Sequence, residues 1–162
     1  MARRVFFSFH FERDIWRANQ VRNSWVTKDR ESAGFWDAAN WEAVKKQGEE
    51  AIKQWINKSL SGTSVTVVLI GKETNTRKWV DYEIEMSSKK GNGMLGIYIH
   101  NMKDQYGATD IKGENPFNYW HKTINGQQKY FSEIYSTYDW INDNGFNNLG
   151  DWVENAANEA GK

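Results

Sequence analysis

The order of apolar and polar positions in residues 63–90 predicts a buried strand, a short turn and an amphipathic helix. The strand is Thr63–Ile70, where the apolar run VTVVLI is typical of a strand covered on both faces, as in a parallel sheet. Gly71 ends this strand, and one of the polar residues at 74–76 (TNT) is expected to cap the helix that follows.

The helix after that turn carries one residue that does not fit its apolar face. Helical spacing places five residues on this face: Trp79, Val80, Glu83, Ile84 and Ser87. Glu83 is the exception, because a carboxylate on an inward face must be hydrogen bonded, shifted in pKa or open to a cleft. Glu85 lies on the other side of the helix, where it can pair with Lys89. Glu83 is therefore a candidate functional residue, although an inward glutamate with a purely structural hydrogen bond fits the same pattern.

The remaining apolar patterns predict an α/β domain with a parallel sheet. Short apolar runs at residues 4–9 and 94–99 predict two further strands, and helical periodicity is present at 14–25 and 41–60. Strands and helices in this alternation form a βαβ series with right-handed crossovers. At 162 residues, the whole chain, 1–162, is expected to be one domain.

The connections between these elements are predicted with less detail. His10–Arg13 is expected to be the loop after the first strand, and loops at this end of parallel strands line ligand crevices. Gly34–Ala39 (GFWDAA) is expected to be an edge strand or an ordered loop. Asn40 is a suitable N-cap for the helix at 41–60, although Gly48 makes one unbroken helix there less favourable.

The pattern weakens after residue 100. The segment at about 101–130 is polar, rich in glycine and contains the only proline, Pro116. It is predicted to be a long loop with short pieces of structure, and such loops are often functional. Two C-terminal helices are predicted at Glu133–Asn142 and Phe146–Asn158.

The composition excludes several classes of function. With 21 acidic and 21 basic residues the net charge is zero, which argues against a nucleic-acid partner bound mainly by charge. The chain has no cysteine, and its three histidines lack the spacing of metal ligands, so no metal site is expected. No apolar run approaches the roughly 18 residues of a membrane span or forms a signal sequence, so a cytoplasmic protein without membrane contact is expected.

The usual nucleotide and hydrolase motifs are also missing. The sequence contains neither GxGxxG nor GxxxxGK[ST]. Ser8, His10 and Asp14 could form a triad on paper, but the GxSxG turn is absent and Ser8 falls within the predicted first strand. That strand ends in Ser-Phe-His, so the acidic cluster of a Mg²⁺-dependent phosphoacceptor is missing as well.

What remains is Glu83 with Trp79 and the aromatic residues of the loops. This combination suits glycosidic chemistry at a ribose. A carboxylate stabilises the positive charge that builds on the anomeric carbon as a neutral base leaves, and aromatic faces can hold the bases. Aromatic residues make up 15% of the chain and include nine tryptophans, more than packing usually requires.

Seven stretches between residues 4 and about 146 carry a family resemblance. They are RVFFSFH, VRNSWVT, GFWDAANWEAVKK, INKSLSGTSVTVVLIG, TRKWVDYEIEMS, KGNGMLGIYIH and YSTYDWINDNGF. In this order and at nearly the family's spacing, they resemble the TIR-like family to which the ThsB proteins of the Thoeris anti-phage defence system belong. The resemblance implies a flavodoxin-like, three-layer sandwich with a central parallel sheet of about five strands and helices on both faces.

The resemblance also implies an activity. Members of this family cleave NAD at the nicotinamide–ribose bond, and ThsB-type members make a cyclic ADP-ribose isomer that activates an effector protein. NAD would be a substrate and no cofactor is implied, while self-association stays open. The family's W-x-x-x-E pattern falls on Trp79–Glu83, so the implied catalytic residue is Glu83. The residues then expected to line the substrate cleft are Ser8, Phe9, His10, Phe35, Trp36, Asp37 and Trp79.

Two other hypotheses fit the same residues. A non-catalytic TIR-like module for protein interaction or assembly would share the fold but would not need Glu83 for its function. A nucleoside-processing transferase on a related fold would use the same carboxylate and would prefer free nucleosides to NAD.

Overall fold

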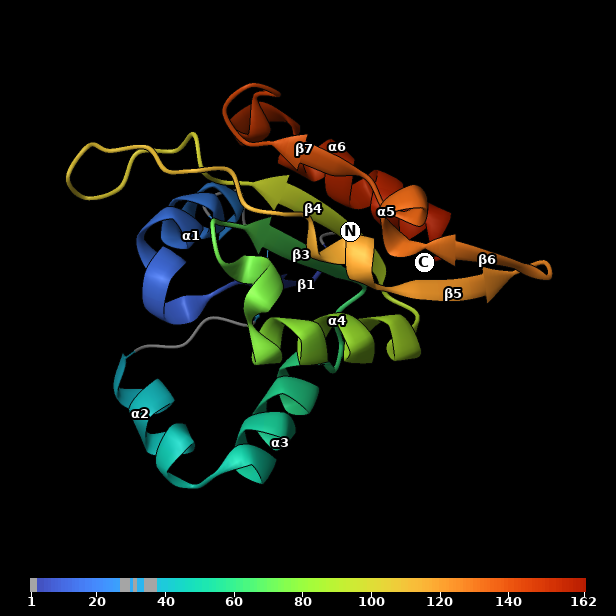
Figure 1. The fold of residues 1–162 in the computed structure, drawn as a ribbon, viewed down its shortest axis with the longest axis horizontal. Coiled ribbons are helices and arrows are strands. Elements are labelled where there is room, and N and C mark those ends of the chain that lie inside the picture. Colours follow the sequence, from blue (N-terminus) through green and yellow to red (C-terminus); the bar gives the residue numbers. More distant parts are fainter. Residues whose placement is uncertain (1–2, 27–29, 31, 34–37) are drawn as a thin grey trace.

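The computed structural model describes residues 3–26, 30, 32–33 and 38–162 of the chain. Five parallel strands form its central sheet (Figure 1). In spatial order they are β2 (Ser32–Ala33), β1 (Val5–Ser8), β3 (Val65–Ile70), β4 (Gly93–Tyr98) and β7 (Thr137–Asp139). Every residue of β1 and β3 is buried, as their nearly continuous apolar sequences predict for central strands of a parallel sheet.

Helices cover both faces of the sheet, which confirms the predicted three-layer, flavodoxin-like architecture. On one face, α1 (Phe11–Val26) and α6 (Gly145–Glu159) pack against side chains such as Phe7. On the other face, α3 (Glu49–Leu60) packs against Phe6, and α4 (Lys78–Lys90) contacts β1, β3 and β4. Phe6 and Phe7 thus serve opposite faces, following the two-residue alternation of a strand.

The first helix begins earlier than predicted. The segment His10–Arg13 was expected to be a loop, but α1 starts at Phe11, and the backbone amide of Asp14 donates to the carbonyl of His10 at 2.9 Å. Glu12 and Asp14 place negative charge in the first turn, where the helix dipole favours it. Strand β1 is therefore followed almost at once by a helix.

Two further predictions about helix starts are wrong. Residues 74–76 do not cap α4 but form a short 3₁₀ helix, η1 (Thr74–Thr76), and Arg77 is the N-cap residue. Asn40 is not an N-cap, because α2 (Ala38–Lys46) begins two residues before it. The break between α2 and α3 falls at Gly48, whose φ of 96° lies in a region that only glycine adopts easily.

The segment after β4 contains little regular structure, as predicted. A loop leads to the 3₁₀ helix η2 (Pro116–Tyr119) and to a hairpin of β5 (His121–Ile124) and β6 (Gln127–Tyr130), which extends away from the sheet in Figure 1. The predicted helix at Glu133–Asn142 is wrong. The helix α5 (Phe131–Ile134) is only four residues long, and Thr137–Asp139 is strand β7, paired with β4.

The last helix agrees with the sequence. The prediction at Phe146–Asn158 corresponds to α6, which is one residue longer at each end. Among the helices that the structure describes, none has the length and apolar character needed to cross a membrane.

Candidate active site

Glu83 lies on the buried face of α4 and is only 6% exposed. Its Oε1 atom accepts a hydrogen bond of 2.7 Å from the hydroxyl of Ser8, the last residue of β1, which is completely buried. Within the part of the chain that the structure describes, Glu83 has no ion-pair partner. It is therefore an inward carboxylate held by one hydroxyl group.

This environment changes the acidity of Glu83. Burial away from water disfavours the charged form and raises the pKa of Glu83 to about 8, against the opposing effect of the Ser8 hydrogen bond. Such a group exchanges its proton close to neutral pH. A strongly shifted pKa beside a cavity is a property of many catalytic carboxyl groups.

A cavity with an empty volume of about 450 Å³, part of it open to solvent, adjoins Glu83. It is enclosed by the start of α1, α2, α3 and the first turns of α4. The residues that line it are Phe9, His10, Phe11, Glu12, Trp41, Ile52, Ile56, Arg77, Trp79, Val80 and Glu83.

Aromatic rings form much of the cavity wall. The ring centroids of Phe9 and Phe11 are 6.3 Å apart, and those of Phe11 and Trp41 are 5.8 Å apart. On α4, Trp79 packs edge-on against Tyr82 with centroids 5.8 Å apart. These flat apolar surfaces can hold a planar base and limit the access of water to Glu83.

The polar residues of the cavity differ in charge state. His10 is buried, and burial, followed by the nearby Arg77 charge, lowers its pKa, so the imidazole is neutral near pH 7. Glu12 is neutralised by Lys45 at 3.2 Å and accepts a hydrogen bond from the indole of Trp41 at 3.4 Å. Arg77 is exposed and lies at the N-cap of α4.

The residues predicted to line the cleft do not all line the cavity in the structure. Phe9, His10 and Trp79 line the cavity together with Glu83. Ser8 does not line it, because its hydroxyl is buried against Glu83. The other three predicted residues, Phe35, Trp36 and Asp37, lie outside the described residues.

Several cavity residues were missed by the sequence analysis. Phe11 and Glu12 were not named individually, although their segment, His10–Arg13, was expected to line a crevice; they do line the cavity, as the start of α1 rather than as a loop. Ile52 and Ile56 share one helix face at i, i+4 spacing, a pattern that indicates core packing and gives no sign of a ligand. Trp41, at the start of the predicted helix, was the one residue whose size and aromatic character could have suggested a cleft wall.

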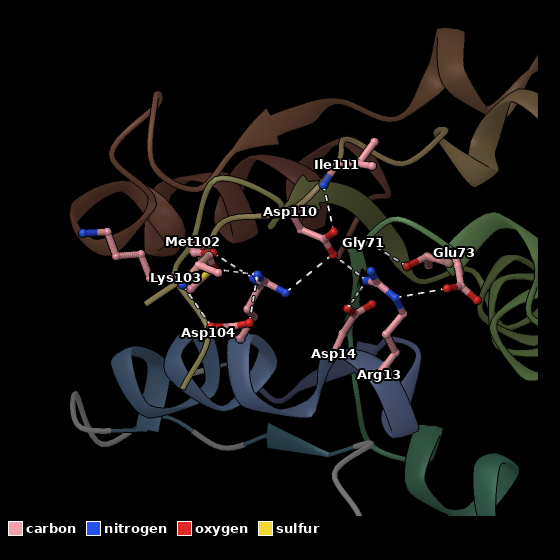
Figure 2. A network of polar contacts seen from close by, with 12 residues as sticks. Arg13, Asp14, Gly71, Glu73, Met102, Lys103, Asp104, Asp110 and Ile111 are labelled. Atoms are coloured by element: carbon pink, nitrogen blue, oxygen red, sulfur yellow. Dashed lines mark hydrogen bonds and ion pairs between the residues drawn. The ribbon is translucent and has the colours of Figure 1, made fainter. Parts of the chain in front are cut away.

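A second group of charged residues lies beside α1 and is called here the arginine network: Arg13, Asp14, Arg17, Glu73, Asp104 and Asp110. Figure 2 shows Arg13 between three carboxylates, at 3.1 Å from Asp14, 3.1 Å from Glu73 and 2.6 Å from Asp110. Arg17 donates to the carbonyls of Met102 and Ala108 at 2.8 and 2.9 Å. The network ties the loops after β3 and β4 to α1, and so fixes the edge of the sheet next to the cavity.

No group of three or more His, Asp or Glu side chains is arranged to hold a metal ion in the portion of the chain described by the structure.

Comparison with known proteins identifies the family of the chain. Residues 6–104 match the family model described as "Thoeris protein ThsB, TIR-like domain". A protein of Bacillus cereus (strain MSX-D12), named "Putative cyclic ADP-D-ribose synthase ThsB1", is 40% identical over 191 residues, which cover 94% of this chain and 100% of the relative. The chain belongs to the TIR-like ThsB family. The matched ThsB region includes every residue that lines the cavity, from Phe9 to Glu83, whereas the hairpin and α6 follow it.

Proposed function

We propose that this chain cleaves NAD at the bond between nicotinamide and ribose and closes the remaining ADP-ribose into a cyclic product. The observation that carries the proposal is Glu83: a buried carboxylate with a pKa near 8, without an ion pair among the described residues, next to an aromatic cavity. Its position in the W-x-x-x-E pattern of a ThsB chain, and the cyclic ADP-D-ribose synthase name of the Bacillus cereus relative, support the same reaction.

The reaction needs a negative charge at the position of Glu83. When the C–N bond breaks, nicotinamide leaves as a neutral base with the bonding electron pair, and positive charge remains on the ribose ring. An ionised Glu83, hydrogen bonded to the ribose hydroxyls, stabilises this charge. A nucleophilic atom of the same ADP-ribose then attacks the anomeric carbon, and its proton is released, which gives a cyclic product.

Water competes with this ring closure. If water attacks the anomeric carbon, the product is linear ADP-ribose and one proton. The rings of Phe9, Phe11, Trp41 and Trp79 line the cavity and can limit the entry of water. NAD serves here as substrate, which is consistent with a sequence that has no dinucleotide-binding glycine motif.

In the same proposal, the product is a diffusible signal of anti-phage defence that acts on a separate effector protein. The support is the membership of the ThsB family and the resemblance in sequence. A direct protein partner is then unnecessary for signalling.

The test is mass spectrometry of products formed from NAD by the wild type and by Glu83→Gln. Purified proteins and lysates of phage-infected cells are both measured, because infection can be the trigger. The wild type is expected to release nicotinamide and a cyclic product in at least one setting, and Glu83→Gln in neither. Full activity of Glu83→Gln would refute the mechanism, and linear ADP-ribose as sole product would refute the cyclisation.

A non-catalytic assembly module makes the opposite prediction. If the chain acts only through protein contacts, Glu83→Gln retains its protective effect in phage-infected cells and no nicotinamide is released by the wild type. The same pair of proteins therefore separates the two functions.

A further inference from the structure

Apart from Glu83, the charged groups around the cavity are paired among the described residues, with the exception of Arg77. Lys45 binds Glu12, and the neighbouring Lys78 binds Glu49. His10 is neutral near pH 7, because burial lowers its pKa. Arg77 lines the cavity and is exposed, and within the described residues it has no hydrogen bond or ion pair through its guanidinium group.

The charge of Arg77 nevertheless reaches into the cavity. It contributes to lowering the pKa of His10 and that of Glu12, two residues of the opposite wall. For Glu12 this effect is smaller than that of Lys45. A guanidinium group whose charge acts across the cavity, and which has no carboxylate partner among the described residues, is available to an anion in the cavity. Planar guanidinium groups bind phosphates through two parallel hydrogen bonds.

The spacing along α4 suits one particular anion. Arg77 and Glu83 are six residues apart, which corresponds to about 9 Å along a helix axis. In NAD, the first phosphate lies one ribose away from the anomeric carbon that reacts. A substrate with that carbon beside Glu83 can thus place its phosphates beside Arg77, at the N-terminal end of α4.

We propose that Arg77 binds the pyrophosphate of the substrate and thereby makes the site select a dinucleotide over a free nucleoside. The inference rests on the proposed function, because it takes the position of Glu83 as the position of the reacting ribose. It also supplies a physical reason for a substrate with two negative charges to enter a cavity that already contains Glu83 and Glu12. Glu12 repels this substrate weakly because Lys45 neutralises it.

The kinetic test compares Arg77→Ala with the wild type on NAD, nicotinamide mononucleotide and nicotinamide riboside. Arg77→Ala is expected to raise KM for NAD about 10- to 100-fold with a much smaller effect on kcat, as for a lost charge-assisted contact made equally in ground and transition states. The riboside, which has no phosphate, should be affected less than about twofold. Arg77→Lys, which keeps the charge but loses the bidentate geometry, should lie in between.

The matched control is Lys72→Ala. Lys72 is an exposed cation on the same connection between β3 and α4 and does not line the cavity. Its loss should leave KM for all three substrates unchanged. An equal loss for NAD and the riboside in Arg77→Ala would show a structural role and overturn the inference, as would an unchanged KM for NAD.

A binding measurement separates this inference from the proposed reaction. Glu83→Gln, alone and combined with Arg77→Ala, is titrated with NAD and with ADP-ribose by calorimetry. The single variant is expected to bind both, and the double variant about 10- to 100-fold more weakly, with a smaller dependence on salt. If Glu83→Gln binds NAD through Arg77 but the wild type never cleaves NAD, the proposed reaction fails and the phosphate site stands. If neither variant binds, or both bind equally, the phosphate site is refuted.

Discussion

Two buried carboxylates, Asp14 and Glu83, lie near the edge of the sheet that borders the cavity. Their surroundings differ. Asp14 is 1% exposed and Glu83 is 6% exposed, so both are removed from water. Asp14 has Arg13 at 3.1 Å and a pKa raised by burial to about 6, whereas Glu83 has only the Ser8 hydroxyl and a pKa raised to about 8. Burial raises the pKa of both groups, and Arg13 opposes this rise only at Asp14.

The space beside the two groups differs as well. The Oδ2 atom of Asp14 is so close to Gly71 that a Cβ atom on that glycine would lie 2.2 Å away, so backbone fills the place where a ligand would bind. Glu83 adjoins a cavity instead. A buried carboxylate that is paired with a cation and has no room for a ligand beside it serves the structure. One that adjoins a cavity and has no cation partner is available for chemistry. The network of Figure 2 is structural in this sense.

The largest effect is expected for Glu83→Gln. Loss of the negative charge should lower the rate of NAD cleavage at least about 1000-fold, comparable to removing a main electrostatic contact of a transition state. The folded protein should not be destabilised at pH 8. Because folding raises this pKa from 4.5 to about 8, the ionised group costs stability as pH rises through that range, and glutamine removes the cost. Chemical denaturation at pH 5 and pH 8 measures this; a less stable variant at pH 8 would contradict it.

In contrast to Glu83→Gln, a substitution in the arginine network should destabilise the folded protein. Arg13→Met leaves Asp14 buried without its guanidinium partner and should lower the free energy of unfolding by about 2–4 kcal/mol at pH 7.5. The loss should be smaller at pH 5, where Asp14 becomes protonated. Urea denaturation provides the measurement. Lys89→Met, which removes only the exposed pair with Glu85 at 3.1 Å, is the control and should have a much smaller effect.

The pH dependence of the reaction tests whether Glu83 acts as a carboxylate. The value of kcat/KM should rise almost tenfold per pH unit between about pH 6 and 8 and level off above, because only the ionised form is active and kcat/KM reports the free enzyme. A rate that is flat through this range would show that the group does not titrate there.

Ser8→Ala is expected to have the smallest of these effects. Its hydroxyl opposes the rise in the pKa of Glu83, so its loss should move the midpoint of the pH profile upward by about one unit. The plateau rate at high pH should fall much less than in Glu83→Gln. An unchanged midpoint with a lower plateau would assign Ser8 to packing or orientation alone.

The sequence was sufficient for the elements whose patterns are local. The nearly continuous apolar runs of β1, β3 and β4 predicted central strands, and the periodicity of α4 alone indicated that Glu83 is an inward carboxylate. The pairing of Glu85 with Lys89 was also correct, because both residues lie on one helix.

Strand β7 could not be predicted in the same way. It is three residues long and exists through its pairing with β4. The sequence around it has the apolar periodicity of a helix, because Ile134, Tyr138 and Ile141 follow one another at helical spacing. By contrast, the hairpin of β5 and β6 had a local signal, Asn125-Gly126, whose positive φ angles of 52° and 80° suit a tight turn.

The partners in the site lie too far apart in sequence for local patterns. The Ser8–Glu83 hydrogen bond joins residues 75 positions apart, and the Arg13–Asp110 contact joins residues 97 positions apart. The role of Ser8 toward Glu83 and the existence of the arginine network therefore required the structure.

The parallel pairing of β1 with β3 also has a consequence for the newly made chain. These strands are adjacent in the sheet, yet α1, β2, α2 and α3 lie between them in sequence, so the pairing must wait for a long crossover. Until it forms, Ser8 and Glu83 are apart, and Glu83 in solvent has the acidity of an ordinary glutamate. We therefore expect activity to appear only after this pairing has formed, so that chains in which β1 and β3 are still unpaired leave NAD intact.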